Sequence, residues 1–401
     1  MKKILFFLFL FLSVFYIFPQ SLVSMEEVVR YLASPELEGR KMQTKGDTLA
    51  IQYLVNQFEK MEIMPFSDQY EQTFCSRSLF TATTGEVCSK NVIAWVEGTD
   101  IKMKEQYILV CGHFDHLGKT KEVYFPGAND NASGTAAVLF LADYFAKNPV
   151  KKSIIFACFA GEELGLLGSH NFIKTYSKLL PTIQYVINFD MIGRYEQGDL
   201  CIMGKETSPI LEKTIKKISS KEKINIKNSS FLFLSGSDHY GFYKKGIPFL
   251  CFNTGDDRGS YHRPKDRADS IDYKGMETIA NFTKQVIEEL GNNSSKPKFK
   301  KIDQNKVKVD YSEIIEKMFA NTKKFGFLIN VSYEYGNDVD IRQTTPKGDE
   351  AGLLIGDKVT KINGKSFSCT ADLLDLVKTE KESPVTITII RDGEEREIDV
   401  Y

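Results

Sequence analysis

Three short apolar runs in this 401-residue chain end beside a histidine or an acidic residue, and a fourth precedes a loop that carries a histidine. They are Tyr107–Cys111 before His113, Ile154–Phe159 before Glu162 and Glu163, Tyr185–Phe189 before Asp190, and Pro248–Phe252 before the loop with His262. Such runs, bounded by glycine or proline, are typical of strands buried on both faces. Helical patterns separate them at Ser133–Ala146, Ser169–Leu179, Pro209–Ser219 and Tyr273–Leu290. The alternation predicts an α/β fold whose mixed, mostly parallel sheet is covered by helices on both faces.

The polar residues at these strand ends form a candidate metal site, because ligands bind outside the carboxyl ends of strands in such sheets. With Asp130, in the helix-opening loop GANDNASG, the candidate ligands are His113, Asp130, Glu163, Asp190 and His262. Two imidazoles and three carboxylates suit two neighbouring zinc ions that share one carboxylate. Taken singly, Asp130 could cap a helix and Glu162–Glu163 could complement a helix dipole. The joint occurrence of all five favours metal.

The order of these motifs resembles the di-zinc aminopeptidase family, over roughly Met25 to Leu290, and so implies a zinc exopeptidase fold. The resemblance implies that Asp130 bridges two zinc ions. It implies one site completed by His113 and Asp190, and the other completed by Glu163 and His262. The implied catalytic residues are Glu162 as general base, Asp115 as the carboxylate that orients an imidazole, and Tyr261 as a hydrogen-bond donor to the oxyanion. Ser237–Asp238–His239 resembles a further family motif, interpreted as a structural or pocket-wall element.

Three functions remain open from the sequence: an aminopeptidase acting on peptide substrates, a glutaminyl cyclase with a single zinc, and an inactive peptide-binding protein. The Asn-Ala-Ser-Gly run after Asp130 and the run GEELGLLGS favour a peptidase over a cyclase. The complete set of ligands and base argues against an inactive protein. Preference for amino- or carboxypeptidase cleavage is not settled by the ligands, because the metal set is shared.

A second domain is expected after a polar, basic linker at residues 291–308. Residues 309–401 resemble a PDZ domain, chiefly through the run Ala351–Gly364. The expected elements include a helix at Thr370–Lys378 and a hairpin at Val385–Tyr401. In this resemblance the loop Lys324–Leu328 (KFGFL) would bind a peptide C-terminus through its backbone N–H groups. The loop departs from the usual G-L-G-F, and a purely structural module is the alternative.

The N-terminus predicts export. Lys2 and Lys3 precede the apolar run Ile4–Phe18, which is short for a membrane span, so residues 1–21 are interpreted as a signal peptide. An uncleaved anchor is the alternative, and membrane contact is expected only through this segment. The expected location is periplasmic or extracellular. A net charge of −1 without a basic stripe argues against nucleic-acid binding.

The seven cysteines do not form a disulfide framework. Cys111, Cys158, Cys201 and Cys251 lie in apolar runs, where a free cysteine behaves as a small hydrophobic residue. Cys75 and Cys88 flank a polar stretch and could close a loop in an oxidising compartment.

Overall fold

The computed structural model describes residues 23–76, 86–120, 123–195, 198–227, 236–254, 260–302, 327–329, 339–344, 346–354, 357–366, 376 and 384–401. The predicted signal peptide lies outside the described residues. So do most of the expected helix Thr370–Lys378 and the start of the KFGFL loop. Within the described ranges, no helix is long and apolar enough to cross a membrane.

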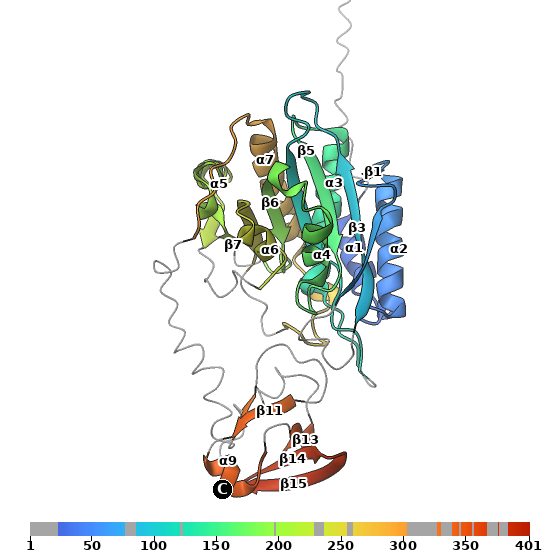
Figure 1. Ribbon diagram of the computed structural model, residues 1–401, viewed down its shortest axis with the longest axis vertical. Helices are drawn as coiled ribbons and strands as arrows, with labels where there is room; N and C mark the ends of the chain where they lie inside the picture. The colour runs from blue at the N-terminus through green and yellow to red at the C-terminus, as the bar shows by residue number, and fades with distance from the viewer. Residues whose placement is uncertain are drawn as a thin grey trace, which may run out of the picture.

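A nine-stranded mixed sheet forms the first domain (Figure 1). Its strands are β1 Met64–Pro65, β2 Glu71–Ser76, β3 Val87–Val96, β4 Tyr107–His113, β5 Ser153–Phe159, β6 Ile183–Phe189, β7 Asp199–Met203, β8 Asn225–Lys227 and β9 Phe249–Asn253. The order is β1-β3-β5-β4-β6-β9-β7-β8, and β2 pairs with β3. The four central strands β5, β4, β6 and β9 run parallel, whereas β3 and β7 join them antiparallel. The predicted sheet is confirmed.

Helices cover both faces of this sheet. One face carries α1 Met25–Leu32, α2 Lys45–Lys60, α3 Ser133–Lys147, α5 Pro209–Glu222 and α7 Tyr273–Asn292, and the other carries α4 Leu167–Thr175 and α6 His239–Lys244. The alternation along β4 shows why both layers are needed. Ile108 and Val110 join the first apolar cluster, and Leu109 and Cys111 join the second. All four are completely buried, as the uninterrupted apolar run predicts.

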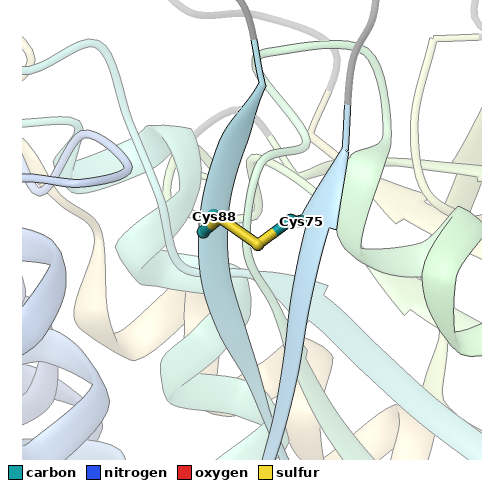
Figure 2. Close-up of a disulfide and its surroundings, with 2 residues drawn as sticks. All are labelled: Cys75 and Cys88. Carbon is teal, nitrogen blue, oxygen red and sulfur yellow. A yellow bond between two sulfur atoms is a disulfide. The ribbon is translucent and has the colours of Figure 1, made fainter.

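A disulfide joins Cys75 in β2 to Cys88 in β3 (Figure 2). The two residues are register partners on antiparallel strands, with Cα atoms 4.0 Å apart. The pairing suggested by the sequence is therefore present. Cys111, Cys158 and Cys251 are buried thiols, and Cys201 is partly buried.

The second domain is a smaller antiparallel sheet. Its elements are β10 Phe327–Ile329, β11 Val339–Thr344, α9 Pro346–Ala351, β12 Lys358–Ile362, β13 Lys365–Ser366, β14 Val385–Arg391 and β15 Glu394–Val400. The strand order is β10-β11-β12-β14-β15, and β13 pairs with β12. The predicted hairpin is confirmed. Its turn at Asp392–Gly393 has φ of 54° and 83°, a conformation that suits an Asp-Gly turn.

The first domain extends beyond the predicted boundary at Gly291. Helix α7 continues to Asn292, and the chain then packs against α6 and its surroundings. Lys300 N donates to Thr207 O at 2.8 Å, and Ile302 N donates to the hydroxyl of Tyr243 at 3.1 Å. The ring of Phe299 lies 5.7 Å from the ring of Tyr243. The residues from 293 to 302, expected as a free linker, therefore pack on the first domain.

Candidate metal centre

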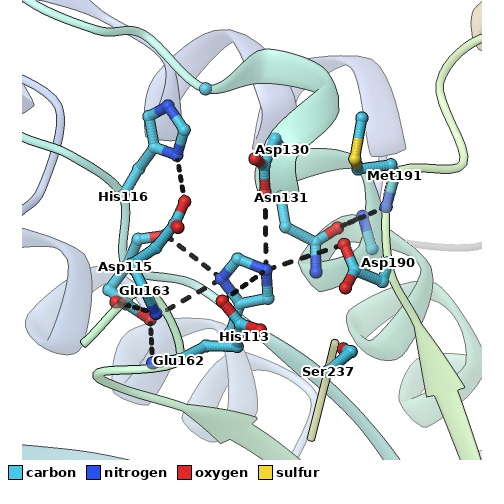
Figure 3. Close-up of polar contacts among 12 residues, drawn as sticks. His113, Asp115, His116, Asp130, Asn131, Glu162, Glu163, Asp190, Met191 and Ser237 are labelled. Carbon is cyan, nitrogen blue, oxygen red and sulfur yellow. Dashed lines mark hydrogen bonds and ion pairs between the residues drawn. The ribbon is translucent and has the colours of Figure 1, made fainter. Parts of the chain in front are cut away.

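The five candidate ligands meet at one edge of the sheet. Figure 3 shows His113, Asp130, Glu163 and Asp190 there. His113 is the last residue of β4, and Asp190 directly follows β6. Glu163 lies in the turn after β5, and His262 lies in the loop after β9. Asp130 lies just before α3. The convergence expected from parallel strand ends is what the structure contains.

The carboxylate of Asp130 lies between the two imidazoles. Its Oδ1 is 3.5 Å from His113 Nε2, and its Oδ2 is 3.1 Å from His262 Nε2. His113 Nε2 is also 3.7 Å from Asp190 Oδ1, and His262 Nε2 is 3.3 Å from Glu163 Oε2. Neighbouring ligand atoms around a tetrahedral zinc ion are about 3.3–3.6 Å apart, given zinc–ligand bonds near 2.0–2.2 Å. The two donor sets therefore fit zinc.

Four of the five candidate ligands are buried, and the fifth, Asp190, is partly buried. His113 is 1% exposed, Asp130 3%, and Glu163 and His262 8% each. Three carboxylates with so little access to water would, without a cation, repel one another and lose hydration. Such a cluster is most readily explained by positive charge at its centre.

The pKa values of the metal-free site reflect this crowding. Burial lowers the pKa of His113, but Glu162, Asp115 and Asp190 outweigh burial and raise that pKa well above its usual value. Burial also lowers the pKa of His262, but the charges of Glu163 and Asp130 outweigh burial and raise that pKa to about 10. Without metal, protons on the two imidazoles supply the positive charge.

Glu162 differs from Glu163 in its surroundings. Burial raises the pKa of Glu162 well above its usual value, whereas the charges of His262 and His116 overcome burial and hold the pKa of Glu163 well below its own. Glu162 Oε2 lies 3.9 Å from His113 Nε2, beside the metal ligands. One of the two adjacent glutamates therefore favours a proton, and the other favours the charged form that a metal ligand needs.

Asp115 connects two ligand-bearing segments. Its carboxylate accepts hydrogen bonds from the backbone N–H groups of Glu162 at 3.1 Å and Glu163 at 3.4 Å. Its Oδ1 lies 3.6 Å from His113 Nδ1, which is also 3.3 Å from the backbone oxygen of Asp115. Asp115 thus contacts the side of the imidazole that faces away from Asp130.

Two other sequence-predicted elements border the ligands. The ring of Tyr261 stacks on His262, with centroids 3.8 Å apart. Ser237 accepts a hydrogen bond from Asn188 at 2.9 Å, and His239 stacks on Phe249 with centroids 4.5 Å apart. Asp238 is fully buried, and burial raises its pKa to about 7. These contacts agree with a wall element beside the site.

The sequence did not predict the hydrogen bonds that join the loop around Asp130 to the segment around Asp190. Asn129 Oδ1 accepts the N–H of Gly193 at 2.8 Å. Asn131 accepts the N–H of Met191 at 3.2 Å and donates to Phe189 O at 2.9 Å. The two asparagines beside Asp130 thus bind the backbone of the other strand end and set the position of one ligand against the other. The run Asn129-Asp130-Asn131, with an amide on each side of the acidic ligand, was the sequence feature that could have indicated these contacts.

His116 also has a larger part than the sequence indicated. Its Nδ1 lies 2.8 Å from Glu163 Oε1, and its side chain is buried. The ring packs against Gly127, where a Cβ atom would come within 2.5 Å of the imidazole and where φ is 58°. A larger residue at this position would displace His116.

Comparison with known proteins gives two family matches. The profile of peptidase family M28 matches residues 91–287, and that of the PDZ domain matches residues 302–401. Aminopeptidase YwaD of Bacillus subtilis (strain 168) is 29% identical over 238 residues, which are 57% of this chain and 50% of that protein. A probable zinc metalloprotease of Pyrenophora tritici-repentis is 38% identical over 111 residues, which are 27% of this chain and 25% of that protein. The chain spans half the length of these relatives or less.

Solved structures share the fold at low identity. The aminopeptidase from Aneurinibacillus sp. strain AM-1 has a TM-score of 0.55 at 17% identity, covering 70% of this chain and 96% of its own. A glutaminyl cyclase of Fimbriiglobus ruber has a TM-score of 0.57 at 20% identity, covering 66% and 94%. These likenesses support the fold and do not separate the two reactions. Through residues 91–287 the chain belongs to peptidase family M28, and through residues 302–401 it carries a PDZ domain.

Proposed function

We propose that this protein is a zinc-dependent aminopeptidase that removes N-terminal residues from peptides and holds two zinc ions. The main support is the Asp130 carboxylate, whose two oxygens face different imidazoles at 3.5 and 3.1 Å. A carboxylate placed between two donor sets in this way suits a site for two neighbouring zinc ions. The match to peptidase family M28 and the likeness to an aminopeptidase support the reaction class.

The proposed ligands divide into two sets that share Asp130. His113 and Asp190 complete one set, and Glu163 and His262 complete the other. Zinc bound there would supply a water of lowered pKa and polarise the carbonyl of the scissile bond. The chain's own contribution is to hold five donors in place and to release the protons of both imidazoles when metal enters.

Glu162 is the proposed general base. It takes a proton from the attacking water and returns it to the amine nitrogen that leaves. Burial raises its pKa, which suits a group that must hold a proton between these two steps. Asp115 positions the turn of Glu162 through its hydrogen bond to the Glu162 N–H. Tyr261 is proposed to hydrogen-bond the developing oxyanion, from its place beside His262.

Metal analysis and a substrate panel test this proposal together. The purified protein should bind two zinc ions per chain and hydrolyse free aminoacyl chromogenic substrates. Versions of the same substrates with blocked N-termini should remain intact. One zinc at saturation, with cyclisation of N-terminal glutamine, would favour the glutaminyl cyclase instead. Zinc binding without turnover of any substrate would favour an inactive peptide-binding protein.

The PDZ domain is proposed to bind the C-termini of peptides and so to select among substrates. It is joined to the first domain through residues that follow Ile302, the last described residue before β10. A tethered binding groove raises the local concentration of the peptides it holds. Small substrates that cannot reach both domains should therefore be unaffected by it.

We also propose that the protein is exported. The support is the apolar run Ile4–Phe18 behind Lys2 and Lys3, together with the Cys75–Cys88 disulfide, since such bonds persist mainly in oxidising compartments. Cell fractionation that recovered the protein only from the cytoplasm would contradict this proposal.

A further inference from the structure

Arg40 is completely buried behind the proposed ligands. It lies between α1 and α2, in a segment that includes none of the candidate ligands. Its guanidinium donates hydrogen bonds to five backbone carbonyl groups, those of Leu32 (3.0 Å), Phe114, Pro126, Gly127 (2.7 Å) and Asp130 (3.4 Å). Three of these acceptors lie within residues 126–130, which form the loop of Asp130. Phe114 directly follows His113. One buried cation thus joins the loop of the bridging carboxylate to the end of β4.

The backbone around Arg40 is shaped for this contact. Glu38, Arg40 and Gln43 have positive φ values of 47°, 41° and 63°. Residues other than glycine rarely adopt such values unless the surrounding structure holds them, and they concentrate at functional sites. Gly39 lies so close to the loop that a Cβ atom there would be 2.4 Å from Gly118 O and 2.5 Å from Phe125 O. The segment of Arg40 therefore packs closely against the backbone at Gly118 and Phe125, and Phe125 directly precedes the loop of Asp130.

A buried charge of the opposite sign holds the same loop through its N–H groups. Asp266 is 1% exposed and lies four residues after His262. Its carboxylate accepts the N–H groups of Asn129 and Asp130, each at 3.0 Å, and its backbone oxygen accepts the N–H of Ala128 at 3.1 Å. The loop of the second histidine is thereby fixed to the loop of the bridging carboxylate.

We propose that Arg40 and Asp266 are positioning residues, which hold the Asp130 loop through its carbonyl groups and its N–H groups, respectively, and orient its carboxylate for two metal ions before metal arrives. Within residues 126–130 both contact backbone groups alone, so the Asp130 side chain stays available to the metals. Charge-assisted hydrogen bonds are roughly twice as strong as neutral ones and suit a loop that must not move. The inference deepens the proposed function and rests on it.

A general loss of stability is the competing explanation, since removing any buried charge is costly. Two other buried charges provide matched controls. Lys152 is 1% exposed and donates to the carbonyl groups of Leu290 and Asn293, at the end of α7. Asp143 is fully buried and pairs with Lys147 at 2.6 Å. It lies about 15 Å along α3 from the start of that helix, at 1.5 Å per residue.

The experiment compares four variants of the full-length protein: Arg40→Lys, Asp266→Asn, Lys152→Met and Asp143→Asn. Each is stripped of metal and titrated with zinc alone, well below its melting temperature, with a chromophoric chelator as competitor. Arg40→Lys and Asp266→Asn should weaken zinc binding about 10–100-fold, as is usual when a partner of a metal ligand is lost. The two controls should lose thermal stability yet bind zinc as the wild type does. At low zinc the first pair should lose kcat with KM nearly unchanged, and excess zinc should restore kcat.

Wild-type zinc affinity in folded Asp266→Asn and Arg40→Lys would overturn the inference while leaving the proposed function intact. Equal weakening in the control pair would also overturn it, in favour of general destabilisation. If Arg40→Lys does not fold, Asp266→Asn decides. A wild-type protein that binds fewer than two zinc ions would refute the proposed function and, with it, this inference.

Discussion

His116 Nδ1 lies 2.8 Å from Glu163 Oε1, while the other oxygen of this carboxylate lies 3.3 Å from His262 Nε2. Because the acceptor is a carboxylate, Nδ1 must carry the hydrogen. One oxygen of Glu163 is thus fixed by a neighbouring side chain, and the other is turned towards the second imidazole. Partners of this kind orient a ligand and are often as important as the ligand itself.

His116→Ala should therefore weaken one zinc site more than the other. Zinc at Glu163 and His262 should bind about 10–100-fold more weakly, because the carboxylate loses its orienting partner. Zinc at His113 and Asp190 should be less affected. Competitive chelator titration resolves the two steps. His116→Asn serves as the control, since its side-chain amide can donate from nearly the same place and should restore most of the affinity. Equal loss at both sites in His116→Ala would contradict the assignment.

Glu162→Gln should separate catalysis from metal binding. The change keeps the size of the side chain but removes the base, so kcat should fall by roughly 10²–10⁴. Zinc content should remain that of the wild type. Asp130→Ala is the contrasting variant and should lose both zinc and activity. The measurement is turnover of an aminoacyl substrate together with metal analysis of the same sample. Near-normal turnover in Glu162→Gln would refute its role as base.

Zinc binding should release protons. The raised pKa values of His113 and His262 mean that both imidazoles are protonated in the metal-free protein at neutral pH, and only the neutral form binds zinc. Affinity should therefore rise with pH from 6 to about 9. Calorimetric titration in two buffers of different ionisation enthalpy, at one pH, should give different heats. Identical heats in both buffers would show that no proton is exchanged.

The same pKa values give the metal-free protein a distinct stability profile. Each of these imidazoles holds a proton in the folded state at pH values where the unfolded chain has released it. Their contribution to the free energy of unfolding is fully present below about pH 6.5, the ordinary histidine pKa, and is lost as pH rises through the folded value. For His262 that value is about 10. Metal-free protein should thus lose stability from this source between neutral and alkaline pH, which urea unfolding at pH 6.5 and 9 measures.

The sequence predicted the ends of the central strands because each is an uninterrupted apolar run that stops at a polar residue. β4, β5, β6 and β9 all contain the predicted run or begin within a residue of it. The meeting of His113 and Asp190 followed from the parallel sheet alone. The roles assigned to these residues stay predictions.

Other contacts in the first domain could not be predicted, because no pattern in the sequence marks them. Arg40 acts on backbone carbonyl groups of residues up to 90 positions away, and no periodicity marks such a contact. Asp266 acts on backbone N–H groups across 136 positions for the same reason. The anchors Phe299 and Ile302 are isolated apolar residues in a polar stretch, which composition alone assigns to a linker. In each case only the folded chain brings the residue and its partner together.

Truncation should show where the first domain ends and what the PDZ domain does. A chain ending at Ile302 keeps Phe299 and Ile302 against α6, so it should fold, retain zinc and hydrolyse small aminoacyl substrates near the full-length rate. A chain ending at Asn293 lacks both anchors. It should be less stable by about 1–3 kcal/mol, because the packing of two half-buried apolar side chains on the first domain is lost. Urea unfolding of the two truncated forms measures this difference.

The chain ending at Ile302 also isolates the effect of the PDZ domain on substrates. Peptides with apolar C-termini should show a raised apparent KM relative to the full-length protein, because the groove that concentrates them is absent. The same peptides with an amidated C-terminus provide the control, since a groove that binds a free carboxylate gains little from them. Their KM should be similar in both forms. If the smallest aminoacyl substrates lost activity as severely as the long peptides, the PDZ domain would instead be part of the catalytic pocket, and the tethered-groove proposal would fail.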